Sequence, residues 1–134
     1  MNYLAIVVAA LAAFAIGFLW HGPLFGNLWM KLSKVSKPDA MTPEMKKHMQ
    51  MSMFWSFIMQ LVTAAVLAQF AALMGTMGVM GAVILAFWAW LGFIVTTAIN
   101  GVLWENKSWN LYYFTIAYHL VSLIVVSLIV VLWK

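Results

Sequence analysis

Cysteine and arginine are both absent from this sequence of 134 residues, and only 7% of its residues are charged. Without cysteine the chain forms no disulfide bond and offers no thiolate to a metal or a substrate. Without arginine it lacks the planar group that holds phosphate or carboxylate at two points, which argues against nucleotide or nucleic-acid binding. We therefore expect no nucleic-acid partner, although seven lysines against three acidic residues give a net charge of +4.

Apolar residues make up 66% of the sequence and dominate its character. An average soluble domain has about 25% charged residues, so water is not the expected solvent for most of this chain. A helix needs about 20 apolar residues to cross the hydrocarbon core of a membrane. Four apolar runs of this kind occupy nearly the whole sequence. The sequence therefore predicts a membrane protein without a separate soluble catalytic domain.

The four apolar runs predict an all-α fold in a single membrane domain, residues 1–134. We expect four transmembrane helices in an antiparallel bundle, with spans at residues 3–20, 53–74, 80–103 and 111–133. Short connections favour antiparallel neighbours. The link at residues 75–78 is short enough to predict that the second and third spans pack against each other.

The chain turns from apolar to polar between the first and second spans. Pro23 disfavours helical geometry at Gly22, so we expect a break near His21, followed by an interfacial elbow at residues 23–32. Residues 31–50 form the most polar stretch and hold five of the seven lysines. Since lysine-rich loops stay in the cytoplasm, this loop is predicted to be cytoplasmic and both termini are predicted to be outside.

Small residues recur at every fourth position of the first span. The row contains Ala5, Ala9, Ala13 and Gly17, and His21 follows at the same spacing. Rows of small residues allow helices in membranes to approach each other closely. The row therefore predicts a helix-packing face.

Polar side chains inside the predicted spans form the first candidate site. His119 lies about nine residues into the fourth span, roughly 14 Å from its start at 1.5 Å per residue. An ionisable group at such a depth is a candidate functional residue. The alternative is a neutral histidine that hydrogen-bonds to a neighbouring helix, as polar side chains in membranes commonly do. The candidate intramembrane polar site comprises His119, Asn100, Gln60, Thr63, Thr96, Thr115 and Tyr112.

A second candidate site lies at the predicted cytoplasmic interface. It comprises His21, Pro23 and Trp29 of the elbow together with Glu105, which follows the third span. Their spacing does not match a metal-ligand pattern, and no serine lies in the motif of a hydrolase nucleophile. We therefore expect no catalytic residue, metal site or cofactor.

Four short motifs resemble those of a known family. The sequence reads GFLWHGPLFGNLW at residues 17–29, WLGF from Trp90, ENKSW from Glu105 and YHLVS from Tyr118. These motifs are similar to those of a bacterial family of four-helix integral membrane proteins known only as a domain of unknown function. The resemblance implies the four-helix fold and the bacterial inner (cytoplasmic) membrane. It implies no reaction, substrate or cofactor.

Three classes of function are open. A non-enzymatic membrane component that associates with copies of itself, with lipid or with another membrane protein needs only the features above. We predict this first class, as a homo-oligomer in the lipid bilayer. The alternative is a small channel or transporter with a polar pathway around His119 and Asn100. A membrane enzyme acting on lipid or quinone near His21 and Glu105 lacks a recognisable catalytic set.

Overall fold

The computed structural model describes residues 2–33 and 42–133, and every regular element in these ranges is a helix. Four helical segments are long and apolar enough to cross a membrane. They are Tyr3–Leu24, Pro43–Met74, Gly78–Trp104 and Trp109–Leu132. The prediction of an all-α protein with four spans is confirmed, and these segments mark the chain as a membrane protein.

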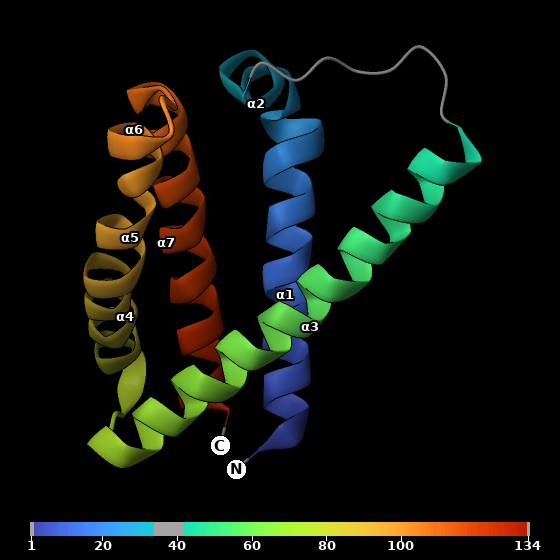
Figure 1. Ribbon diagram of the computed structural model, residues 1–134. Coiled ribbons are helices and arrows are strands. Elements are labelled where there is room, and N and C mark those ends of the chain that lie inside the picture. The colour runs from blue at the N-terminus through green and yellow to red at the C-terminus, as the bar shows by residue number, and fades with distance from the viewer. Residues whose placement is uncertain (1, 34–41, 134) are drawn as a thin grey trace.

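The first span ends in the predicted break. Helix α1 (Tyr3–Leu19) continues into a π-helical turn, η1 (Trp20–Leu24), and the short helix α2 (Gly26–Ser33) lies across its end (Figure 1). Gly22 leaves helical geometry with φ −119° and ψ −108°, because the ring of Pro23 clashes with an α-helical residue before it. The expected elbow is therefore a real change in chain direction.

Helix α3 (Pro43–Met74) starts earlier than the predicted second span. Thr42 caps it, because its Oγ1 accepts a hydrogen bond of 3.1 Å from the backbone N–H of Met45, and Pro43 takes the first helical position, which it favours. The predicted polar loop at residues 31–50 is thus helical at both ends, and residues 34–41 lie outside the described ranges. Figure 1 shows that α3 crosses α1 obliquely.

The third span is interrupted twice. It consists of α4 (Gly78–Ala89), a π-helical stretch η2 (Trp90–Val95), α5 (Thr96–Ala98) and α6 (Asn100–Trp104). Its link to α3 is tight because Gly75 and Gly78 adopt positive φ angles of 64° and 77°, which glycine tolerates without steric cost.

The prediction that the second and third spans pack against each other is wrong. Helix α4 packs mainly on α7 (Trp109–Leu132), whereas α3 packs mainly on α1 and α7. The reason is the oblique course of α3, which diverges from α4 beyond the short link (Figure 1). A tight turn joins two helix ends, but it does not by itself align the two helices.

Helix α7 is the central element, because α1, α3 and α4 all pack on it. The Oγ of Ser108 caps its start by accepting from the N–H of Leu111 at 3.1 Å. The core contains many small side chains, and fully buried examples are Ala9, Ala13, Ala64, Ala82, Ala86 and Val126. The row of small residues in the first span therefore forms a packing face, as predicted.

We predict that reporters fused to the two chain ends lie on the same side of the membrane. The side-chain Nδ2 of Asn2 donates a hydrogen bond of 3.1 Å to the carbonyl oxygen of Trp133, so the first and last spans end together. Fusions to a reporter that is active only outside and to one that is active only inside give the measurement. Opposite signals from the two ends would contradict the fold.

Candidate functional site

The structure separates the residues of the predicted intramembrane site. Asn100, Tyr112 and Thr115 line a pocket of about 240 Å³ beside the link between α6 and α7. Gln60 lines a different pocket, between α1 and α3. The predicted residues therefore do not gather around one cavity.

The hydroxyl groups of Thr63 and Thr96 are bonded to their own helices. Thr63 donates to the carbonyl of Met59 at 3.0 Å, and Thr96 donates to the carbonyl of Gly92 at 2.6 Å. In η2 the widened helical turn changes the usual backbone pairing, and carbonyls in a membrane need internal donors. The Thr96 hydroxyl thus has a structural role.

Two bonds between helices support the same irregular stretch. The hydroxyl of Tyr112 donates to the carbonyl of Val95 at 2.9 Å, and the indole N–H of Trp90 donates to the carbonyl of Ile116 at 2.8 Å. Both bonds connect η2 to α7. Tyr112 is therefore a buried structural residue that holds the third span to the fourth.

His119 lies half-buried on α7, and its ring is 4.8 Å from that of Tyr118. None of the hydrogen bonds among the described residues involves its side chain. The amide Nε2 of Gln60, another residue of the predicted intramembrane site, donates to the hydroxyl of Tyr118 at 3.4 Å. Tyr118 is not among the predicted site residues, although the YHLVS motif contains it.

An aromatic cluster fastens the elbow to α7. The ring of His21 lies 5.1 Å from Tyr118, 5.7 Å from Phe114 and 5.5 Å from Trp29, in edge-to-face geometry. Trp20 lies 4.8 Å from Phe25. Edge-to-face pairs place the positive edge of one ring against the negative face of another. The cluster therefore fixes the direction in which the chain leaves α1.

The hydrogen bond of His21 indicates which tautomer its imidazole adopts. Its Nδ1 lies 3.0 Å from the carbonyl oxygen of Gly17. A carbonyl oxygen only accepts hydrogen bonds, so Nδ1 carries the proton of this pair. In the neutral ring, Nε2 is then left as an acceptor.

The predicted interfacial site is only partly assembled. His21 and Trp29 are in ring contact, and Pro23 belongs to the same turn. Glu105 instead lines the pocket beside the α6–α7 link, with its carboxylate 3.8 Å from the amino group of Lys107. Within residues 2–33 and 42–133, no three histidine or acidic side chains are grouped as metal ligands.

Polar side chains of α3 also line a groove that lies between α1 and α3, which we call the α1–α3 groove. Its volume is about 330 Å³. Ser52, Ser56 and Gln60 line it from α3, as their spacing of four residues predicts for one helix face. The other lining residues are Phe14, Gly17, Phe18, His21, Met49, Met53 and Tyr118.

Tyr118 reaches the groove because Gly17 has no side chain. A Cβ atom on Gly17 would lie 2.8 Å from the Tyr118 hydroxyl oxygen. Tyr118 is 8% exposed, so it has little room to move aside. The glycine in the small-residue row thus makes the Gln60–Tyr118 contact possible.

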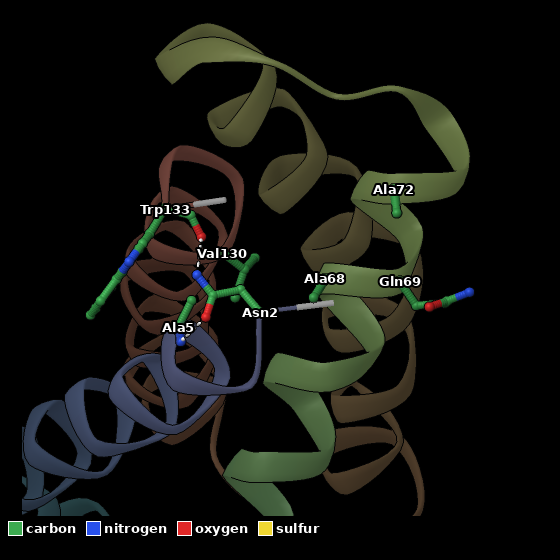
Figure 2. A pocket seen from close by; sticks show the side chains of 7 residues that line it. All are labelled: Asn2, Ala5, Ala68, Gln69, Ala72, Val130 and Trp133. Carbon is green, nitrogen blue, oxygen red and sulfur yellow. Dashed lines mark hydrogen bonds between the residues drawn. The ribbon is translucent and has the colours of Figure 1, made fainter.

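A second cavity, of about 530 Å³, lies where the chain ends meet (Figure 2). The side chain of Asn2 is already engaged there, because its Oδ1 accepts from Ala5 N–H and its Nδ2 donates to Trp133. Gln69 points away from the other lining side chains in Figure 2. Three of its seven lining residues are alanines and its Asn2 side chain is already hydrogen-bonded, so the α1–α3 groove is the better candidate binding site.

We predict that Gly17→Ala destabilises the protein by about 1–3 kcal/mol, the usual cost of overfilling a packed contact. The new methyl group would push Tyr118 away from Gln60. Thermal unfolding in a mild detergent measures the effect. The control is Gly92→Ala, because a Cβ atom there meets nothing within 4 Å. Equal melting temperatures for the two variants would show that the Gly17 contact is not tight.

Comparison with known proteins identifies a family but no activity. Neither the curated proteins nor the solved structures contain a match to this chain. A family model described as "Protein of unknown function (DUF1761)" matches residues 4–131. The match runs through all four apolar segments and includes the motifs from which the resemblance was inferred. The chain therefore belongs to the DUF1761 family of proteins of unknown function.

Proposed function

We propose that the protein is a non-enzymatic component of the bacterial cytoplasmic membrane that associates with further copies of itself. The observation that carries this proposal is the uncovered first part of α3. The buried residues of this helix are Ala64, Leu67 and Ala71, all in its last third. From Pro43 to Thr63 no residue of α3 is buried, and the start of the helix extends away from α1 and α7 (Figure 1).

The uncovered part of α3 has a surface suited to another helix. Trp55, Met59 and Val62 are 53%, 54% and 52% exposed and follow one another at spacings of four and three residues. Such residues lie on one side of a helix. Methionine adapts its shape to a partner because it is unbranched and flexible.

A second copy of the chain is the partner that this surface favours. Lipid tails also cover apolar side chains, so apolarity alone does not drive association in a membrane. Two copies related by a twofold axis would, however, cover the same uncovered surface on both at once. The association would cover the side of this helix that faces away from α1 and α7.

The charge distribution supports a cytoplasmic location for the elbow and an outside location for both termini. Helix α2, the start of α3 and the α6–α7 link lie at one end of the molecule (Figure 1). This end carries Lys31, Lys46, Lys47 and Lys107. Lysine in short loops is retained on the cytoplasmic side.

The transport alternative has weaker support. A polar pathway needs the side chains around His119 and Asn100 to converge, yet Asn100 and Gln60 line different pockets. The Thr63 hydroxyl is bonded to its own helix. An enzyme at the elbow has weak support too, because His21 and Glu105 line different pockets.

We predict that Met59→Cys forms disulfide-linked dimers in native membranes after mild oxidation. The parent chain has no cysteine, so any cross-link reports the introduced thiol. Ala64→Cys is the matched control, because Ala64 lies on the same helix with 0% exposure and should stay monomeric. Monomers for Met59→Cys and Trp55→Cys, together with a single-copy mass in lipid nanodiscs, would refute self-association through this part of α3.

A second prediction separates association from transport. Cysteines placed at Thr63 and His119 should resist a membrane-impermeant thiol reagent from either side, whereas one at the exposed Asn100 should react from one side only. The reason is that Asn100 lies beside the α6–α7 link at the end of its span. Labelling in intact and inverted vesicles measures this. Reaction at all three positions would favour a water-filled pathway.

A further inference from the structure

The α1–α3 groove contains hydrogen-bonding groups that the protein does not use fully. A glutamine amide has two N–H donors and an acceptor oxygen, and the structure uses one of these donors of Gln60, on Tyr118. In the neutral imidazole of His21, Nε2 is an acceptor because Nδ1 faces the Gly17 carbonyl. The hydroxyl groups of Ser52 and Ser56 add further donors and acceptors.

The groove lies at a depth where a lipid head meets its tail. Gly17 is fourteen residues after Tyr3, which is about 21 Å along α1 at 1.5 Å per residue. The hydrocarbon core is about 30 Å thick, so Gly17 lies in the third of the core nearest the elbow. His21 is one turn closer to the surface. The groove therefore extends from the head-group layer into the hydrocarbon.

The lining residues define the chemistry of an occupant. None of the described residues that line the groove is a lysine or an acid, so nothing there neutralises a phosphate or an ammonium group. Phe14, Phe18 and Met53 provide apolar walls. Because Nε2 of His21 is an acceptor, it would bind a hydroxyl group of the ligand. The Gln60 amide and the serine hydroxyl groups are donors, so they would bind carbonyl or ether oxygens of the ligand.

We propose that the α1–α3 groove binds the uncharged, hydroxyl-bearing head of a membrane amphiphile. The head hydrogen-bonds to Gln60, Ser56 and His21, and the tail lies along Phe14 and Phe18. A cavity of about 330 Å³ is within the range of ligand pockets, about 300–1,000 Å³. Two kinds of lipid carry such a head: a glyceride, and the reduced form of an isoprenoid quinone.

This proposal does not depend on self-association, because the groove and the surface proposed for self-association lie on different faces of α3. Ser52, Ser56 and Gln60 face α1, whereas Trp55, Met59 and Val62 are exposed and do not line the groove. Failure to cross-link at Met59 would therefore leave the groove proposal intact.

The experiment measures retention of three probes by the full-length protein released from detergent in native mass spectrometry. The probes are dioleoylglycerol, a short-chain menaquinol kept reduced with dithionite, and phosphatidylglycerol as the charged comparison. We expect binding of dioleoylglycerol, menaquinol or both at least tenfold tighter than binding of phosphatidylglycerol. Preference for one of the first two identifies the source of the head group. Equal or tighter binding of phosphatidylglycerol, or no retention of either uncharged probe, would overturn the proposal.

Variants locate the bound probe. Gln60→Leu should weaken binding about tenfold, equivalent to about 1.4 kcal/mol, and Ser56→Ala should weaken it less. Gln69→Leu is the matched control, since it makes the same change on the same helix at a residue that lines the other cavity. Should Gln60→Leu fail to fold, Ser56→Ala, at an exposed position, still tests the site. Equal affinity of Ser56→Ala and the parent, or equal losses at Gln60 and Gln69, would place the probe outside the groove.

Discussion

The contact of Tyr118 with the bare backbone of Gly17 is the interaction on which the arrangement of three spans depends. Tyr118 belongs to α7, Gly17 to α1, and the Gln60 amide that donates to the Tyr118 hydroxyl belongs to α3. One side chain thus meets both neighbouring spans. Small residues let helices in a membrane approach closely enough for such bonds to form, and here a single missing Cβ provides that space.

The two irregular turns follow from the requirement that backbone groups in a membrane find partners inside the protein. At the elbow, His21 bonds to the carbonyl of Gly17 one turn earlier. In η2, Thr96 bonds to Gly92 and Tyr112 reaches Val95 from α7. Two residues of the predicted intramembrane site, Thr96 and Tyr112, therefore serve as donors to the carbonyl groups of an irregular helical stretch.

The sequence was sufficient for the number of spans, the break before Pro23 and the packing role of the alanine row. Each of these follows from local chemistry: apolar length, the proline ring, or the absence of a bulky side chain. The direction of α3 was not predictable in this way. The local sequence of a tight link, such as the one at Gly75, does not determine whether the two helices that it joins pack together or diverge.

The candidate site was predictable only in part, for a related reason. The common face of Ser52, Ser56 and Gln60 follows from helical periodicity, but their neighbour Tyr118 depends on how α1 and α7 pack. The sequence grouped His119 and Gln60 as polar residues inside the spans. The Gln60 amide bonds to the adjacent Tyr118, whose side chain reaches past Gly17 to α3.

The slanted course of α3 bears on how the protein sits in bilayers of different thickness. Helices α1 and α7 pack closely along the core and end together at Asn2 and Trp133, so their combined height is set by the fold. The stretch of α3 from Pro43 to Ser56 contains exposed residues only, and a helix longer than the hydrocarbon core adjusts to it by tilting. A thinner membrane is then accommodated by a greater inclination of this one helix, while the rest of the molecule keeps its shape.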